Sequence, residues 1–283
     1  MSLELHSVIN AVGDLPPMPV VAVKVVQMLQ DPKTNAADLA EAISRDQAVS
    51  ARVLKIANSS FYSLKRQVKT LEHAIAILGE KTLKSLVLAA SLKGLNKSFG
   101  LMEKMLWEDS IGCATGARLI AGYVQSTDPE EAFLAGLFRH IGRMVMNNLD
   151  PDRYRQVVEE AYNDGGRIDE AERRHFPFSH AVIGAAVLEK WNFSEALSRS
   201  VRHHEDLAIS AEEEPQLYRL TAVVNLADHF CRFLGIGQRS PGEDLDVAQC
   251  PGARALGVEP ERARLFLDEF RAAFEKDREV FLA

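Results

Sequence analysis

Five ionisable side chains of this sequence fall on the apolar faces of expected helices, each on a different helix. They are Asp109, His140, His180, His204 and Asp228. His204, for example, follows Leu197 and Val201 at the spacing that places residues on one side of a helix. Burial of such groups costs several kcal/mol unless they are hydrogen-bonded, paired with an opposite charge or bound to a metal. We therefore expect each of the five to have a specific partner in the protein interior.

Imidazole and carboxylate groups that come from separate helices are typical of a metal site. This donor set suits a divalent transition metal such as iron, manganese or zinc, and helical bundles build such sites from facing helices. The five residues are therefore candidate metal ligands. A buried polar network that joins the helices without a metal accounts for the same spacing, so the spacing leaves both interpretations open.

Three further side chains close to these positions are candidates for an anion pocket. They are Arg139, Arg143 and His203. Adjacent residues on a helix point about 100° apart, so we expect His204 in the core and His203 at the edge of a pocket. The sequence contains no dinucleotide-binding fingerprint, no P-loop and no nucleophile elbow. No catalytic residue is therefore assigned.

The elements that must position these groups are expected to be helices. Apolar residues recur at intervals of three and four, and no sustained alternation of apolar and polar residues indicates a strand. One helix is predicted to begin at Pro16–Pro17, because proline is tolerated in a first turn, and to end at Asp31–Pro32. Another is predicted to begin near Leu71 and to end at Gly79.

These helices are expected to form an all-α protein with three segments. A boundary near residues 96–100 separates an N-terminal helical subdomain, residues 1–98, from a larger helical core, residues 99–235. Residues 236–283 hold a connection rich in Gly, Pro and Asp and a final helix over residues 259–281. The apolar spacing of that helix fits packing on the core and also fits a homodimer.

Composition narrows the class of protein. Of the 283 residues, 47% are hydrophobic and 26% are charged, which is typical of a globular protein with a core. The net charge of −7 argues against broad binding to nucleic acid. The three cysteines form no CxxC pair, no secretion leader is recognisable and no apolar run reaches the roughly 20 residues that span a bilayer. We therefore expect a cytoplasmic protein without a membrane partner.

Several sequence blocks match the pattern of a known family. They are LPPMPV at residues 15–20, DQAVSARVLKIANS at 46–59, VKTLEHAI at 68–75 with Leu78–Gly79, WEDS at 107–110 and GLFRHIGR at 136–143. The pattern continues through His180 and His203–His204 and ends near Asp228. Together these blocks resemble the HDOD domain, a regulatory relative of the HD metal-dependent phosphohydrolases. The resemblance implies an N-terminal helical bundle packed on a larger HD-like helical bundle.

The resemblance also bears on the candidate ligands. In HD phosphohydrolases, histidines and aspartates from separate helices hold metal ions that activate water for attack on a phosphoester. Four residues match metal-binding positions of the fuller HD-type sites: His180, His203, His204 and Asp228. Arg139–His140 stands where those enzymes have their His–Asp pair, and Asp109 stands where they have their first histidine. A guanidinium is always charged and has no acceptor, so Arg139 cannot bind a metal.

The resemblance implies a bacterial signal-transduction module of the HDOD type, and the altered pair indicates that this module is not an enzyme. Such a module would bind a signalling protein or a small anionic ligand. The alternative is a metal-dependent phosphohydrolase or phosphodiesterase with an altered ligand set. The altered His–Asp pair favours the regulatory module, whereas the retained His180, His204 and Asp228 favour the enzyme.

Overall fold

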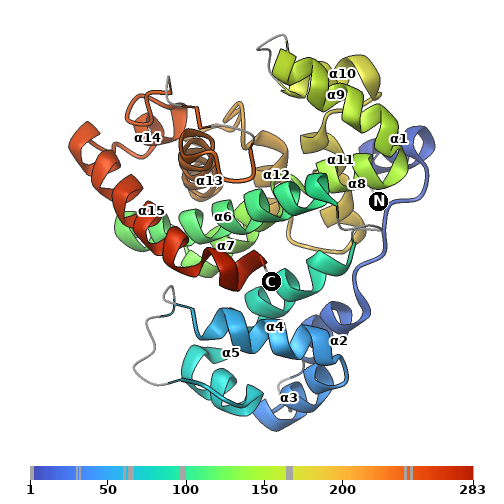
Figure 1. Ribbon diagram of the computed structural model, residues 1–283, viewed down its shortest axis with the longest axis vertical. Coiled ribbons are helices and arrows are strands. Elements are labelled where there is room, and N and C mark those ends of the chain that lie inside the picture. Colours follow the sequence, from blue (N-terminus) through green and yellow to red (C-terminus); the bar gives the residue numbers. More distant parts are fainter. Residues whose placement is uncertain are drawn as a thin grey trace. The chain divides into compact units, whose positions relative to one another are not determined.

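The described part of the chain contains helices and no strand (Figure 1). The computed structural model describes residues 3–29, 31, 33–59, 62, 67–95, 100–163, 168–238, 241–242 and 245–282. The expected all-α class is therefore confirmed. Within these residues, no helix combines the length and apolar character that crossing a bilayer requires.

The chain divides into two compact units. The first comprises Met1–Pro17 and Lys97–Leu267, and the second comprises Met18–Asn96 and Asp268–Ala283. The last helix, α15 (Pro260–Leu282), contributes residues to both units. The boundary expected near residues 96–100 falls largely outside the described residues, and the division into three segments stays a prediction.

The second unit is built around a long helix. Its helices are α2 (Val20–Met28), α3 (Ala36–Ser44), α4 (Gln47–Ala57), α5 (Leu71–Leu92) and the 3-10 turn η2 (Lys93–Leu95). Helix α5 contacts α2, α3 and α4. The side chain of Asn35 caps α3, and that of Asp46 caps α4, as short polar residues do at helix starts. Arg52 joins α4 to α5 by donating to the Ala90 carbonyl at 2.7 Å.

The helix predicted to begin at Pro16–Pro17 begins later, at Val20, so this start was wrong. Its N-cap residue is Pro19, which has an extended ψ of 137°. A residue that precedes proline is pushed away from helical angles, and Met18 stands in that position. Successive prolines therefore delay the helix. Its end before Asp31 is confirmed, because α2 ends at Met28.

The break predicted at Gly79 is present inside α5. Gly79 has a φ of 82° and a ψ of 169°, a region that essentially only glycine occupies. This conformation divides α5 into two helical stretches. Most side chains from Thr82 to Leu92 are buried, so the second stretch lies in the core of its unit.

The first unit holds the candidate metal ligands. Its helices are α1 (Leu3–Val12), α6 (Leu101–Val124), α7 (Pro129–Phe138), α8 (Ile141–Leu149), α9 (Pro151–Asn163), α10 (Ile168–His175), α11 (His180–Lys190), α12 (Glu195–His203), α13 (Pro215–Leu234), α14 (Pro251–Ala255) and the first part of α15. Helix α6 packs against α7 and α13, and α11 packs against α8 and α12. Every residue from Leu106 to Ala117 is buried, so α6 is the central helix of this unit.

Two glycines allow helices of the first unit to approach one another at backbone distance. A Cβ on Gly136 would lie 2.7 Å from the carbonyl oxygen of Cys113, and a Cβ on Gly142 would overlap the carbonyl of His180. The contacts bring α7 against α6, and α8 against the start of α11. The turn between α7 and α8, which carries Arg139 and His140, is therefore held beside both Asp109 and His180.

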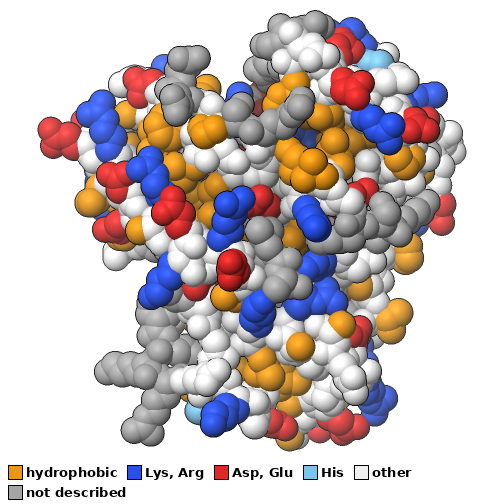
Figure 2. Space-filling view, viewed as in Figure 1, with side chains coloured by type: hydrophobic (Ala, Val, Ile, Leu, Met, Phe, Trp, Pro, Cys, Tyr) orange, Lys and Arg blue, Asp and Glu red, His pale blue; other side chains and the backbone are white. Residues whose placement is uncertain are grey.

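The final helix predicted over residues 259–281 is confirmed as α15. Phe266, Phe270 and Phe274 are buried along one side of it, and the Phe266 ring stacks on Tyr123 with centroids 4.4 Å apart. Leu265, in contrast, is 54% exposed. Figure 2 shows a face on which hydrophobic, acidic and basic side chains are interspersed, and single exposed apolar residues are normal on such a surface. The apolar side of α15 is thus buried by other residues of the same chain. A homodimer stays a prediction.

Candidate metal centre

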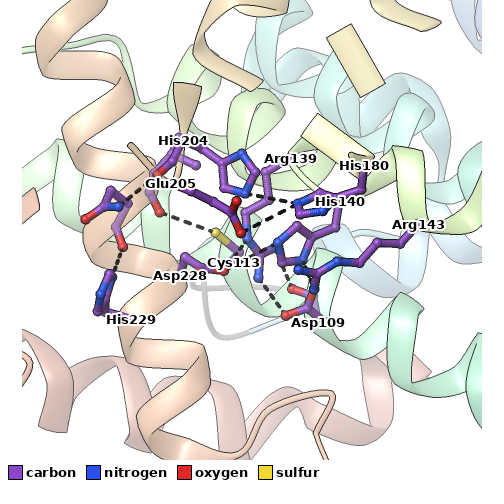
Figure 3. A network of polar contacts seen from close by, with 12 residues as sticks. Asp109, Cys113, Arg139, His140, Arg143, His180, His204, Glu205, Asp228 and His229 are labelled. Carbon is purple, nitrogen blue, oxygen red and sulfur yellow. Dashed lines mark hydrogen bonds and ion pairs between the residues drawn. The ribbon is translucent and has the colours of Figure 1, made fainter. Parts of the chain in front are cut away.

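All five candidate ligands are buried, and all lie in the first unit (Figure 3). They come from five places in the fold: the middle of α6, the turn after α7, the first residue of α11, the residue after α12, and α13. In that order they are Asp109, His140, His180, His204 and Asp228. None is more than 7% exposed. The expectation that these groups point into the interior is therefore confirmed.

The two aspartates are bound by an arginine. Arg139 is fully buried. Its Nη2 donates to Asp109 Oδ1 at 2.6 Å, and its Nε donates to Asp228 Oδ1 at 2.7 Å. Its Nη1 donates to the backbone carbonyl of Asp109 at 3.1 Å. The guanidinium thus lies between two carboxylates and supplies the positive charge that they require in the interior.

The ion pairs affect the two carboxyl groups differently. Burial is the largest single effect on Asp228 and opposes its ionisation, but Arg139 and the other positive groups nearby together outweigh burial and hold the pKa of Asp228 well below its usual range. For Asp109, burial is the larger effect and raises the pKa despite the charge of Arg139. The arginine therefore secures the ionised form of Asp228 in particular.

Two histidines present bare nitrogens to each other. His180 donates from Nδ1 to Glu172 Oε2 at 2.6 Å, and the same oxygen accepts the His180 backbone N–H at 2.9 Å. His204 donates from Nδ1 to the Val201 carbonyl at 2.7 Å. A carboxylate and a carbonyl can only accept, so Nδ1 carries the proton when the ring is neutral, and Nε2 then carries the lone pair. The two Nε2 atoms are 3.5 Å apart.

Two neutral rings in this arrangement would need a positive charge between them. Burial lowers the pKa of His204 to about 4, so its ring is neutral at pH 7. Both side chains are fully buried, and two lone pairs that face each other repel. A proton or a metal ion between the Nε2 atoms would remove this repulsion. A carboxylate or carbonyl behind each imidazole is also the arrangement that orients histidines as metal ligands.

His140 completes a triad of imidazoles. Its Nδ1 lies 2.6 Å from Asp109 Oδ2, which directs Nε2 away from that carboxylate. The His140 ring lies 4.8 Å from the His180 ring and 5.2 Å from the His204 ring, measured between centroids. Ligand atoms of the three histidines lie within 4.8 Å of one another, as do those of Asp109, His140 and Asp228. These His and Asp groups could therefore hold a metal ion.

The five predicted ligands thus converge but separate into two halves. The aspartate half, Asp109 and Asp228, is already paired with Arg139. The histidine half, the Nε2 atoms of His140, His180 and His204, fits a transition metal by the chemistry of its donors. Their role as metal ligands stays a proposal.

The residues of the predicted anion pocket have separate partners. Arg139 binds the two aspartates. Arg143 Nε lies 3.3 Å from Glu172 Oε1, and its Nη1 lies 3.1 Å from His140 Nδ1. His203 Nδ1 pairs with Asp206 Oδ1 at 3.1 Å, and its side chain is 21% exposed. The anion pocket stays a prediction, and the carboxylates leave less positive charge for an anion than the sequence suggested.

Sequence reasoning missed Glu172 and Glu205, which both contact the histidine half. Glu172 is fully buried behind His180, but it lies in a run of charged residues in α10 where no apolar stripe distinguishes it. Glu205 Oε1 lies 3.9 Å from His180 Nε2. In the sequence, Glu205 directly follows the candidate ligand His204, and this position is the feature that could have identified it.

Fold and site together define an HD-like helical protein in which an arginine lies among the buried aspartates and histidines. The family model of the HDOD domain matches residues 15–207, which is more than half of the chain, so the chain belongs to the HDOD family. An HDOD domain protein of unknown function from Geobacter sulfurreducens superposes with a TM-score of 0.79 at 23% identity, covering 98% of this chain and 96% of that one. A candidate phosphohydrolase from Shewanella amazonensis SB2B superposes with a TM-score of 0.75 at 23% identity. The superposition covers 100% of this chain and 99% of that one.

The chain is also similar to part of a longer protein. An uncharacterized protein of Treponema pallidum (strain Nichols) is 23% identical over 237 residues, which are 79% of this chain and 44% of that protein. The chain thus spans less than half the length of this relative. The similarity to solved structures concerns the fold alone.

Proposed function

We propose that this protein is a regulatory module of the HDOD family that acts by binding, in bacterial signal transduction, and not by catalysis. The observation that carries the proposal is the Arg139 guanidinium between Asp109 and Asp228, at 2.6 and 2.7 Å. Those carboxylates are the hard oxygen donors of the centre. Because the guanidinium holds Oδ1 of each, it competes with a catalytic metal for these carboxylates.

Charge strengthens this argument. A metal ion bound directly by the two aspartates would lie against the Arg139 guanidinium and be repelled in an interior of low dielectric constant. Arg143 adds a further positive charge next to His140. Binding of a signalling protein or a small anionic ligand in the cytoplasm is part of the same proposal.

A metal-dependent phosphohydrolase or phosphodiesterase is the second candidate. The observation that favours it is the pair of bare Nε2 atoms on His180 and His204. A metal bound to these nitrogens would supply a Lewis acid and an activated water if one coordination position stayed open. The name of the Shewanella amazonensis relative points in the same direction.

Hydrolysis of a phosphomonoester and a phosphodiester distinguishes the two candidates. Purified full-length protein would be loaded in turn with Zn²⁺, Mn²⁺ and Fe²⁺ and assayed with p-nitrophenyl phosphate and bis(p-nitrophenyl) phosphate. The regulatory proposal predicts no turnover above that of the same metal in buffer. Turnover in the loaded protein that disappears in His180→Ala would reject it and establish the enzyme.

A further inference from the structure

We propose that a groove between α2 and α3 binds a small zwitterionic ligand, such as a short peptide with free ends. The groove is open to solvent and has a cavity volume of about 510 Å³, within the range of about 300–1,000 Å³ that is typical of ligand sites. It belongs to the second unit, whereas the buried ion centre belongs to the first. The inference therefore goes beyond the proposed function and does not depend on it.

The groove is lined by one face of each helix and by the segment that connects them. Lys24 and Met28 lie four residues apart on α2. Asp38, Ala42 and Arg45 follow at spacings of four and three on α3 and its C-cap. Residues at these spacings share one face of a helix. Half-buried Met28 and buried Ala42 give the groove apolar surface between its charged side chains.

The charged side chains of the groove indicate the class of ligand. Three are basic and three are acidic, so their formal charges sum to zero. They are Lys24, Lys33, Arg45, Asp31, Asp38 and Glu41. A groove of this kind does not favour a ligand with a large net charge of either sign. A ligand that carries both charges can pair with both sets of side chains.

The two lysines of the groove are available to an anionic group. In the described part of the chain, no hydrogen bond or ion pair engages the ammonium of Lys24 or Lys33. Lys24 is also half-buried. An opposite charge interacts more strongly with a partly buried ammonium than with one surrounded by water. A carboxylate of the ligand is therefore expected beside these lysines.

The carboxylates of the groove keep acceptor atoms for a cationic group. Oδ1 of Asp31 and Oδ2 of Asp38 each accept one backbone N–H, at 2.9 and 3.1 Å. Glu41 Oε1 pairs with Arg45 Nη2 at 2.9 Å. Among the described residues, the second oxygen of Asp31 and of Asp38 accepts no hydrogen bond. An ammonium of the ligand can bind there, because an ionised carboxylate accepts at both oxygens.

The first test uses three forms of one dipeptide with an apolar body. Dileucine carries both charges, N-acetyl-dileucine keeps only the carboxylate, and dileucine amide keeps only the ammonium. Each would be titrated into the full-length protein and followed by saturation-transfer NMR, which detects the weak binding expected of exposed ion pairs. The proposal predicts saturable binding of one dileucine per chain. Each blocked form should bind at least about threefold more weakly, because it loses one set of ion pairs.

The second test removes both free ammoniums by combining Lys24→Gln with Lys33→Gln. Lys69→Gln is the matched control, since Lys69 is exposed and does not line the groove. The double variant should bind dileucine at least about threefold more weakly, while the control should match the wild type. Circular dichroism would confirm the helix content of each protein.

Three results would overturn the proposal. They are equal affinity for dileucine in the double variant and the wild type, equal affinity of the wild type for dileucine and a blocked form, and no binding of dileucine to the wild type. None of them bears on the hydrolysis assay, which tests the regulatory function separately.

Discussion

Arg139 is the residue that decides what the centre of this protein can do. It forms ion pairs with two carboxylates in a fully buried position, and a buried ion pair is most costly to break when only one partner is removed. The contacts that would compete with a metal for the aspartates therefore also stabilise the fold.

Arg139→Met should destabilise the protein by about 3–5 kcal/mol, because it leaves Asp109 and Asp228 buried without a counter-charge. Urea unfolding followed by circular dichroism measures this change. Arg118→Met is a suitable control, since Arg118 pairs with Glu130 while its own side chain is 26% exposed, and a partly exposed pair contributes about 1 kcal/mol or less. Equal losses in the two variants would show that the charge of Arg139 is not needed.

His204 should make stability depend on pH. Its pKa is lowered to about 4 by burial, whereas in the unfolded chain it lies near 6.5. Between these values the unfolded state binds more protons, so stability is fully present above about pH 6.5 and falls as the pH drops toward 4. The urea midpoint at pH 7.5 and at pH 5 measures this, with His204→Gln as the comparison. A wild type and variant with the same pH dependence would contradict the prediction.

At the level of the elements, close backbone contacts bring the ligands together. Helix α8 meets the start of α11 at Gly142, which places His140 beside His180. At the other end of α11, the extended segment Leu15–Pro16 is bound to the helix. Lys190 Nζ donates to the Leu15 carbonyl at 2.6 Å, and Trp191 Nε1 donates to the Pro16 carbonyl at 2.9 Å. Both ends of α11 are thus fixed by contacts with distant parts of the sequence.

Gly142→Ala should destabilise the protein by about 1–3 kcal/mol, because the added methyl overlaps the His180 backbone. Gly122→Ala in α6 is the matched control. Gly122 is exposed and a Cβ there meets no atom within 4 Å, so the same substitution should stabilise the helix by up to about 1 kcal/mol. Thermal unfolding of both variants provides the comparison, and changes of the same sign would refute the steric argument.

Trp191→Phe should remove the hydrogen bond to Pro16 while keeping most of the aromatic packing against Phe138, whose ring lies 6.1 Å away. The expected loss is about 1 kcal/mol. Hydrogen exchange should also increase at residues that precede Pro16, since this anchor holds the segment. Unchanged exchange there would mean that Lys190 alone fixes the segment.

For the whole molecule, the metal centre and the global stability should be coupled. An ion that binds the folded protein and not the unfolded chain stabilises it by about 2.7 kcal/mol at a free concentration of 100 times Kd. Addition of Zn²⁺ to chelator-stripped protein should therefore raise the melting temperature, and His180→Ala should abolish the increase. An equal increase in the variant would place the bound ion elsewhere in the chain.

The sequence determined the helical class, the end of α2, the break at Gly79 and the final helix. Each depends on local chemistry: apolar periodicity, the lack of a proline N–H, and glycine at a positive φ. Apolar spacing also predicted that five ionisable groups point inward, because residues three and four positions apart lie on the same face of a helix. These groups are Asp109, His140, His180, His204 and Asp228.

Only the tertiary structure decided how the five groups are paired. Arg139 and Asp228 are separated by 89 residues in the chain, and nothing local indicates that a guanidinium reaches both aspartates. The supporting carboxylate of Glu172 lies in a charged helix, where the sequence does not distinguish it. Partners across helices follow from the packing of the whole unit, since ion pairs and hydrogen bonds depend on distances of a few ångströms that spacing along the chain does not specify.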